Sequence, residues 1–531
     1  MIRYSDIETS DAMLFPYQKE MKHLVFSKWD TMNNVMVQMP TGTGKTILFA
    51  SIVRDIRNWI ISNHKHSHVL ILAHVRELIQ QAADKLQKRG IDSGIIMSGF
   101  PRQLDKIVQV ASIQTFMSER NKDVMAMEKF DFIIIDEAHH AMSPRYRNLW
   151  DMFPKSKKLG VTATPWRMDH SGFTSIFDDI IISRPIEWFV KEGYLCNYDY
   201  FSIALNSDIQ HEINSIDRFG VDGDFLEEEL ISRFDNDSIR AKLYESYLQY
   251  CKGKKGIVYA INRQHAANIL NTYQGHGVSI AMIDGTTSKT QREDLLDAFR
   301  VGNLEVIVNV NIFSEGFDCP DIEFIQLARP TKSLSLFLQQ IGRGLRISKS
   351  KDKGIILDNV GLYNRFGTPM ANRQWLCHFR GRETDLLAYN DGTGLSRDIV
   401  FEDRNPDYSE GEEQMVLVEH AEGGQQIRKA ESEDAGHGIG EYNVFKKRGK
   451  YGICSKSNRT IIPPIYEDMH PYYKGYIPFK LHGKWGIMLS NGVVKVKPKY
   501  YLIGAFVDGK AEVKNTKDSE SYYINGNLER L

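Results

Sequence analysis

The feature that most constrains this chain is a repeated alternation between short apolar runs and longer helical stretches. From Val35 to about Leu159, runs such as Val69–Leu72 and Phe132–Ile135 alternate with helical stretches such as Val75–Leu86. A second series of the same kind extends from Gly256 to Leu357. Short strands that alternate with helices indicate a parallel sheet covered by helices. We therefore expect an α/β fold with two parallel-sheet domains in tandem.

The first of these domains contains a segment suited to binding phosphate. The apolar run Val35–Val37 leads into a glycine-rich loop, Pro40–Thr46, and then into a helical run that extends to Ile56. Glycines let backbone amides approach phosphate oxygens, and the start of a helix adds a partial positive charge. The strict pattern has Gly where this chain has Met39, and a structural turn with an incidental lysine is the alternative. We expect the Thr46 hydroxyl to bind Mg²⁺ and the loop to bind ATP, through Thr41, Gly42, Thr43, Gly44 and Lys45.

About ninety residues after this loop, two carboxylates begin the sequence Asp-Glu-Ala-His at 136–139. Asp136 and Glu137 would lie at the carboxyl end of a buried strand, where open α/β sheets bind their ligands. Phosphoryl transfer to water requires a metal that neutralises charge and a group that positions and deprotonates the water. Asp136 is therefore predicted to hold the metal, and Glu137 to activate the water. A solvated acidic turn is the alternative, and the phosphate loop makes it less attractive.

The second domain carries polar residues in Gln339–Arg346 that suit the same chemistry. Arg343 and Arg346 are three residues apart, so a helix would present both guanidinium groups on one side. Two fixed cations stabilise the charge on a transferring phosphoryl group. Because they belong to the second domain, they would reach the nucleotide only when the domains close, which would couple ATP turnover to domain motion. A solvated arginine pair is the alternative.

Several segments resemble the motifs of superfamily 2 helicases. Gly160–Pro165 resembles motif III, Ser314–Pro320 motif V, Gln339–Arg346 motif VI, and Leu14–Gln18 the adenine-reading segment. The resemblance covers roughly residues 12 to 380. It is strongest to the DEAH-box branch with XPB-like and UvsW-like proteins and the motor subunits of type I restriction enzymes. It implies two RecA-like domains, and catalytic or nucleotide-binding roles for Gln18, Gly316, Asp318 and Gln339.

Nucleic-acid contacts follow from the same resemblance. His74–Leu78, Ala111–Thr115, Tyr259–Arg263 and Gly285–Thr287 look like strand-contacting motifs. Contacts to sugar and phosphate can use backbone amides and hydroxyls, which leave no charge signature. Taken alone, each such residue is more readily explained as a plain loop residue. The resemblance assigns strand contacts to Arg76, Gln114, Thr115 and Thr286.

The C-terminal part of the chain repeats itself with a period of about 34 residues. Gly449–Ile453 returns as Gly483–Ile487, and Tyr442 returns as Tyr476. Short β-rich runs alternate with turn residues, so small hairpins stacked side by side are expected. The landmarks resemble the WG repeat, and we expect a module that binds a protein or nucleic acid.

These patterns divide the chain into four parts. We expect the first RecA-like domain at residues 1–190, the second at 191–387, an acidic linker at 388–437 and the β-rich repeats at 438–531. Residues 191–236 have no clear strand pattern and are interpreted as a connector or insertion. The linker combines many acidic residues with few apolar ones, which favours a mobile segment.

Composition limits the remaining choices. The net charge of −1 predicts a local rather than a global nucleic-acid surface. Five scattered cysteines without a zinc-ligand pattern favour a reducing, cytoplasmic location, and no apolar run approaches the roughly 18 residues of a membrane span.

The favoured function is an ATP-dependent DNA helicase or translocase that moves along or unwinds nucleic acid. Three alternatives remain: a duplex DNA translocase that does not separate strands, an RNA helicase, and an inactive scaffold protein. No nuclease pattern of clustered Asp, Glu and Lys occurs outside the motor motifs, so a cutting function is not expected.

Overall fold

A computed structural model groups the chain into two compact units, residues 1–428 and residues 429–531. It describes residues 3–7, 9, 14–73, 76–101, 103–118, 129–204, 207–310, 319–381, 415–421, 442–447, 450–455, 460–470, 476–481, 483–489, 494–504, 510–517, 519–525 and 530.

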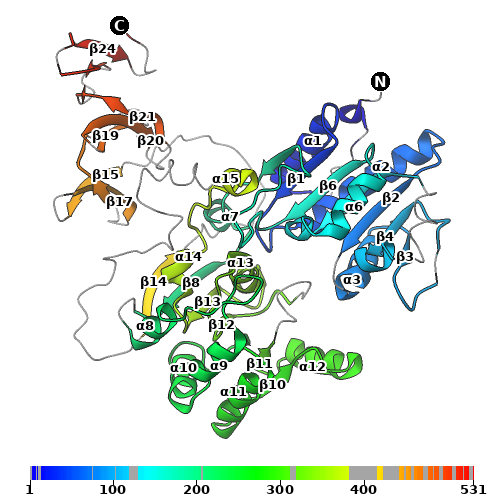
Figure 1. The fold of residues 1–531 in the computed structure, drawn as a ribbon. Coiled ribbons are helices and arrows are strands. Elements are labelled where there is room, and N and C mark those ends of the chain that lie inside the picture. Colours follow the sequence, from blue (N-terminus) through cyan, green and yellow to red (C-terminus); the bar gives the residue numbers. More distant parts are fainter. Residues whose placement is uncertain are drawn as a thin grey trace. The chain divides into compact units, whose positions relative to one another are not determined.

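The first lobe of residues 1–428 is built on a seven-stranded sheet with the order β3-β4-β2-β5-β6-β1-β7 (Figure 1). All its strand pairs are parallel. Its central strands are almost wholly buried because apolar side chains cover both faces. The strands are β1 (Asn34–Gln38), β2 (His68–Ala73), β3 (Ser93–Ile96), β4 (Val108–Ser112), β5 (Phe130–Asp136), β6 (Lys157–Thr162) and β7 (Asp179–Ile182). The helices are η1 (Tyr4–Asp6), α1 (Pro16–Trp29), α2 (Lys45–Ser62), α3 (Arg76–Gln87), α4 (Ile113–Phe116), η2 (Ala138–His140), α6 (Pro144–Met152) and α7 (Ile186–Lys191).

The second lobe is built on a seven-stranded sheet with the order β10-β11-β9-β12-β13-β8-β14. When the strands of each lobe are counted along the chain, both sheets have the same order: third, fourth, second, fifth, sixth, first and seventh. The two RecA-like parallel-sheet domains expected from the sequence are thereby confirmed. The strands are β8 (Asn197–Ser202), β9 (Gly256–Tyr259), β10 (Ile280–Ile283), β11 (Val306–Asn309), β12 (Phe324–Leu327), β13 (Lys353–Asp358) and β14 (Val416–Ala421). The helices are α8 (Asp208–Asn214), α9 (Glu227–Phe234), α10 (Asp237–Tyr250), α11 (Arg263–Gly275), α12 (Lys289–Val301), α13 (Leu334–Gly344), α14 (Leu362–Phe366) and α15 (Trp375–Arg380).

Strand β8 lies within residues 191–236, which the sequence pattern did not identify as part of the sheet. It pairs with β13 on one side and β14 on the other. Its polar residues are buried with partners: Asp199 binds Lys353 and His420, and the Ser202 hydroxyl donates to Asp358 at 2.9 Å. These satisfied polar groups conceal the apolar pattern. The interpretation of 191–236 as a connector is therefore wrong for β8.

Strand β14 lies within residues 388–437, which we expected to form an acidic linker. It closes the second sheet by antiparallel pairing with β8. Its Glu419 carboxylate accepts a hydrogen bond from the Tyr198 hydroxyl, so this acidic residue supports the sheet. The linker interpretation does not hold for residues 416–421. Residues 388–414 and 422–437 lie outside the described part of the chain.

The described residues of the unit 429–531 form three antiparallel sheets, which confirms the small β-rich domain. Two of its strand pairs repeat in phase, since Phe445 lies opposite Gly452 and Phe479 lies opposite Gly486. A Cβ atom at Gly486 would lie 2.9 Å from the Phe479 ring and 2.6 Å from a backbone oxygen, so this position requires glycine. The strands are β15 (Tyr442–Lys447), β16 (Lys450–Ser455), β17 (Thr460–Tyr466), β18 (Asp468–Met469), β19 (Tyr476–Leu481), β20 (Lys484–Leu489), β21 (Val494–Tyr500), β22 (Leu502–Ile503), β23 (Lys510–Lys514) and β24 (Tyr522–Asn525).

The aromatic residue of each repeat packs against the following hairpin. Tyr451 packs against a cluster that includes Ile477 and Phe479. Trp485, only 4% exposed, packs in a cluster with Ala511 and Val513. One hairpin therefore completes the core of the next, as expected for stacked repeats.

Candidate ATP site

The loop after β1 has a backbone conformation that depends on its glycines. Gly42 and Gly44 have φ angles of 88° and 86°, which L side chains rarely adopt. Gly44 caps α2, so Lys45 is the first helical residue. Met39 donates its N–H to the Thr162 carbonyl at 3.0 Å. This position therefore continues the sheet ladder, which explains why it does not need glycine.

Helix α1 holds the loop through two side chains. The Tyr17 hydroxyl donates to the Thr43 carbonyl at 2.7 Å. Gln18 Nε2 donates to the Thr43 and Gly44 carbonyls at 3.2 and 3.4 Å, and Gln18 Oε1 accepts from the Phe15 N–H at 3.0 Å. The sequence identified Gln18 but not Tyr17, because the loop contact of a tyrosine on a helix has no local signature.

A buried ion pair fixes α1 against α2. Lys22 and Asp55 form this pair, and their side chains are 0% and 1% exposed. Lys22 Nζ also donates to the Ser51 hydroxyl at 3.0 Å. Removing one partner of a buried pair costs about 3–5 kcal/mol, because the other charge is left unpaired. Gln18 is thus held in place relative to the phosphate loop, by residues that no sequence motif indicated.

Asp136 ends β5, and Glu137 follows in a strained conformation. Glu137 has a φ of 51° and a ψ of 53°, a left-handed conformation that is unusual for a non-glycine residue and is found at functional sites. Its N–H donates to Asp136 Oδ1 at 3.0 Å. The backbone N–H of Glu137 therefore orients the Asp136 carboxylate at the end of the strand.

His139 connects the acidic box to the segment Gly160–Pro165. Its Nδ1 lies 3.0 Å from the Thr162 hydroxyl and 3.4 Å from Glu137 Oε2. The Thr162 hydroxyl in turn accepts from the Thr164 N–H at 3.1 Å. A movement of Gly160–Pro165 would therefore be transmitted to Glu137 through the contacts of His139.

Helix α13 carries Gln339 and Arg343, whose side chains are 4% and 5% exposed. The helix ends at Gly344, so Arg346 lies beyond it. The prediction of two arginines on one helical face is therefore wrong for Arg346. Gly342 and Gly344 weaken the last turn, since glycine is a poor helix former.

The end of α13 lies against the phosphate loop. A Cβ atom at Gly342 would lie 2.5 Å from Thr41 Cβ. A Cβ atom at Gly42 would lie 3.0 Å from Leu195 and 3.5 Å from Arg346 Cγ. Glycine on both sides therefore allows the second lobe to touch the loop of the first.

The charges around Lys45 come from both lobes. Burial lowers the pKa of the Lys45 ammonium; Glu137 and Asp136 oppose this, and Arg343 and Arg346 lower its pKa further. Two carboxylates and two guanidinium groups thus lie close enough to act on one lysine. The structure brings together the main residues that the sequence predicted for phosphoryl transfer.

Comparisons with known proteins point to one family. Residues 11–167 match the family described as "Type III restriction enzyme, res subunit", residues 240–348 the "Helicase conserved C-terminal domain", and residues 451–485 the "WG containing repeat". A 51.5 kDa protein of a Lactococcus phage is 30% identical over 346 residues, which cover 65% of this chain and 70% of that protein. The chain belongs to the superfamily 2 helicases. Within them it falls in the branch that includes restriction-enzyme motors, and it is an ATP-using enzyme of the helicase type.

Two further relatives of this superfamily 2 chain have informative names. "Putative ATP-dependent helicase IRC3" of Saccharomyces cerevisiae is 31% identical over 338 residues, which are 61% of this chain and 48% of that protein. "DNA 3'-5' translocase XPB2" of Sulfurisphaera tokodaii is 25% identical over 390 residues, which are 66% and 84% of the two chains. The chain thus spans about half the length of the yeast relative.

The predicted strand-contacting residues of the first lobe follow two neighbouring strands. Arg76 begins α3 after β2, and its side chain lies outside the described residues. Gln114 and Thr115 lie in α4, directly after β4, and Gln114 is exposed. Because β2 and β4 are parallel neighbours, all three positions lie at the carboxyl edge of the sheet, where such folds bind ligands.

Thr286 lies in an exposed loop of the second lobe that a buried carboxylate organises. Asp284 Oδ1 accepts from the N–H and hydroxyl of Thr286, both at 2.8 Å, and Asp284 pairs with Arg263. Burial alone would raise the pKa of Asp284, but the bonds from Thr286 and the pairing with Arg263 lower it. The sequence did not single out Asp284.

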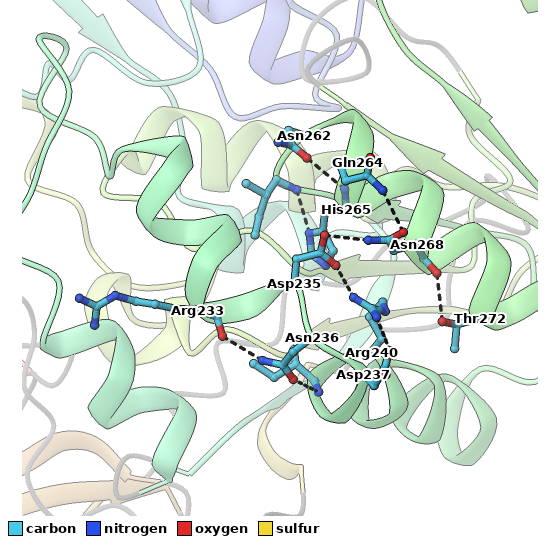
Figure 2. Close-up of polar contacts among 12 residues, drawn as sticks. Arg233, Asp235, Asn236, Asp237, Arg240, Asn262, Gln264, His265, Asn268 and Thr272 are labelled. Carbon is cyan, nitrogen blue, oxygen red and sulfur yellow. Dashed lines mark hydrogen bonds and ion pairs between the residues drawn. The ribbon is translucent and has the colours of Figure 1, made fainter.

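Helix α11, which begins at Arg263, is fastened to the segment before α10. Asp235 accepts from Asn268 Nδ2 at 2.8 Å and pairs with Arg240, as Figure 2 shows. Beside them His265 is fully buried, and burial lowers its pKa to about 4. Residues near the predicted connector thus position a helix of the second lobe.

Most of the segment Ser314–Pro320, which resembles motif V, cannot be placed in the structure. Gly316 and Asp318 lie outside the described residues.

Thr46, a predicted Mg²⁺ ligand, lies in the first turn of α2, half-buried, beside Lys45. No cluster of three metal-ligating side chains occurs among the described residues.

None of the helices in the described part of the chain combines the length and the apolar character needed to cross a bilayer.

Proposed function

We propose that this protein is an ATP-driven motor that moves along DNA, with its ATP site completed by Arg343 and Arg346 of the second lobe. The observation that carries the proposal is the approach of Gly342 to Thr41, which places the end of α13 against the phosphate loop. A loop that binds phosphate would support an ATPase alone. Two cations from a second lobe make hydrolysis sensitive to the arrangement of the lobes, which a motor requires.

Each residue of the site has a distinct role in this proposal. Lys45 contacts the β and γ phosphates, and Thr46 and Asp136 hold Mg²⁺, which neutralises phosphate charge when bound. Glu137 positions and deprotonates the attacking water. Gln18 contacts the adenine. Arg343 and Arg346 stabilise the transferring phosphoryl group, and Gln339 lies one helical turn before Arg343 on the same helix.

The choice of DNA over RNA rests on the names of relatives. The archaeal relative is called a DNA translocase, and it matches over 84% of its own length. An RNA helicase, DBP3 of Meyerozyma guilliermondii, is also similar, at 23% identity over 54% of its length. The better coverage favours DNA. We assign strand contacts to Arg76, Gln114, Thr115 and Thr286.

The remaining features are consistent with work inside the cell. Cys196, Cys251 and Cys319 are buried free thiols. Free buried thiols suit a reducing compartment such as the cytoplasm.

The second motor domain extends to β14, so the proposed domain limits are 1–190 and 191–421 for the two motor domains, with a repeat domain from residue 438.

The experiment is an ATPase assay with a panel of matched single-stranded, duplex and forked DNA and RNA. The wild-type protein should hydrolyse ATP faster with DNA than with RNA, and Lys45→Ala should reduce the rate to background. The control is Lys155→Ala, an exposed lysine remote in sequence from the loop. Equal stimulation by RNA and DNA would refute the preference for DNA. Identical rates for wild type and Lys45→Ala would refute the assignment of ATPase activity to this site.

A further inference from the structure

The repeats have a positive net charge, in contrast to the rest of the protein. Residues 442–531 contain sixteen lysines and arginines and seven acidic residues, a net charge of +9. Since the whole chain has a net charge of −1, residues 1–441 have −10. The net charge of −1 is therefore the sum of a basic segment, residues 442–531, and an acidic segment, residues 1–441. A concentrated positive charge attracts polyanions, and the effect decreases with salt.

Exposed lysines recur at the turns of the three hairpins. Lys450 follows the turn between β15 and β16, Lys484 the turn between β19 and β20, and Lys517 lies in the turn between β23 and β24. All three are exposed. We call them the turn lysines.

The core of the repeats fixes the order of these turns. β16 contacts β18, and β20 contacts β22, so that each hairpin lies beside the next. The Glu467 carboxylate, which follows the first hairpin, accepts from the Gly483 N–H at 2.9 Å, at the turn of the second. Tyr451 and Trp485 join successive hairpins through shared apolar clusters. The three turn lysines therefore follow one another along the stacked hairpins.

We propose that the repeats bind the phosphate backbone of nucleic acid, independently of its sequence, through the turn lysines. A row of flexible cations suits a row of phosphates, because lysine acts as a point charge and needs no fixed geometry. The repeats would keep the motor domains close to the nucleic acid. The inference deepens the proposed function by naming a second contact with the same polymer.

The experiment compares two triple variants in the full-length protein. Lys450→Gln with Lys484→Gln and Lys517→Gln removes the turn lysines. The matched control, Lys499→Gln with Lys510→Gln and Arg530→Gln, removes the same charge from three other exposed positions of the repeats. Binding of a labelled DNA duplex is measured by fluorescence anisotropy without ATP, at several salt concentrations.

The turn variant should lose affinity on the order of tenfold, and the slope of log K against log salt should become shallower by about 2 to 3. The control should change by less than about threefold. Equal effects of both variants, or no change of the slope in the turn variant, would overturn the proposal. Saturation of the wild type by an acidic protein, but not by DNA, would overturn it as well.

Failure of this inference can be distinguished from failure of the proposed motor. At saturating DNA, the turn variant should hydrolyse ATP at the wild-type rate, with a raised half-saturating DNA concentration. A motor without ATPase activity would leave the binding result interpretable, because binding is measured without ATP.

Discussion

The two lobes of the motor share one strand order, but the ends of corresponding strands differ. β1 leads through the glycine-rich loop into α2, which makes a phosphate site. β8 occupies the same place in the second sheet, yet residues 203–207, which lead from it to α8, contain no glycine. The second lobe instead contributes Arg343 and Arg346. Two copies of one scaffold can therefore supply different halves of a single site.

Loss of the water-activating carboxylate in the first lobe is expected to have one of the two largest effects. Glu137→Gln should lower kcat about a thousandfold, because the general base is lost while its shape is kept. ATP affinity should stay near the wild-type value. Phosphate release at saturating ATP and DNA measures the first quantity, and a fluorescent ATP analogue measures the second.

The control for this variant is Glu228→Gln, which changes an exposed glutamate of α9. It should retain wild-type activity. A Glu137→Gln protein that hydrolyses ATP normally would show that the first lobe does not supply the base.

A smaller effect is expected from separating the lobes by one methyl group. Gly342→Ala would place a Cβ atom 2.5 Å from Thr41 Cβ, so α13 must move away from the loop. A displacement of about 1 Å can reduce a rate about a hundredfold, and we expect a loss of kcat of this order with ATP binding retained. Steady-state kinetics with and without DNA measure it.

The matched control is Gly275→Ala, at the end of α11, where an added Cβ atom meets nothing within 4 Å. This variant should keep wild-type kinetics. Unchanged kcat in Gly342→Ala would mean that the approach of the two lobes does not matter for hydrolysis.

The smallest predicted effect concerns the second lobe alone. Burial lowers the pKa of His265 to about 4, below its unfolded value of about 6.5. As pH falls below about 6.5, the unfolded chain binds a proton that the folded lobe does not, so stability is lost. Between pH 7 and 5 the loss should be about 2 kcal/mol.

His265→Asn should show a smaller loss over the same range, since Asn does not titrate and can still accept from the Ile261 N–H. Urea titrations at pH 7 and 5, followed by the proteolytic protection of α11 peptides, measure the difference. An equal pH dependence in both proteins would contradict a buried neutral histidine.

Sequence reasoning predicted elements whose pattern is local. The loop at Gly42 and Gly44, the strand end at Asp136 and the helix with Arg343 each have a signature within a few residues, and each lies where it was expected. The repeat period likewise predicted the antiparallel hairpins. Features that depend on contacts between distant residues were missed. β8 was missed because Asp199 and Ser202 have partners far along the chain.

The same limit applies within the candidate site. The Tyr17 contact with Thr43 and the Lys22 pair with Asp55 join residues 26 and 33 positions apart, respectively. Helix α13 ends before Arg346 because Gly342 and Gly344 are poor helix formers, an effect that the motif spacing does not indicate. The basic charge of the repeats is not visible in the total charge of −1, because the acidic residues of the rest of the chain offset it.

The central claim is that the second lobe completes the ATP site, and Arg343→Ala tests it most directly. DNA-stimulated phosphate release should fall about a thousandfold or more, as expected when a cation that stabilises the transition state is lost, while ATP affinity changes less than about tenfold. Arg145→Ala, an exposed arginine of α6, should behave as wild type. Wild-type hydrolysis by Arg343→Ala would contradict the claim.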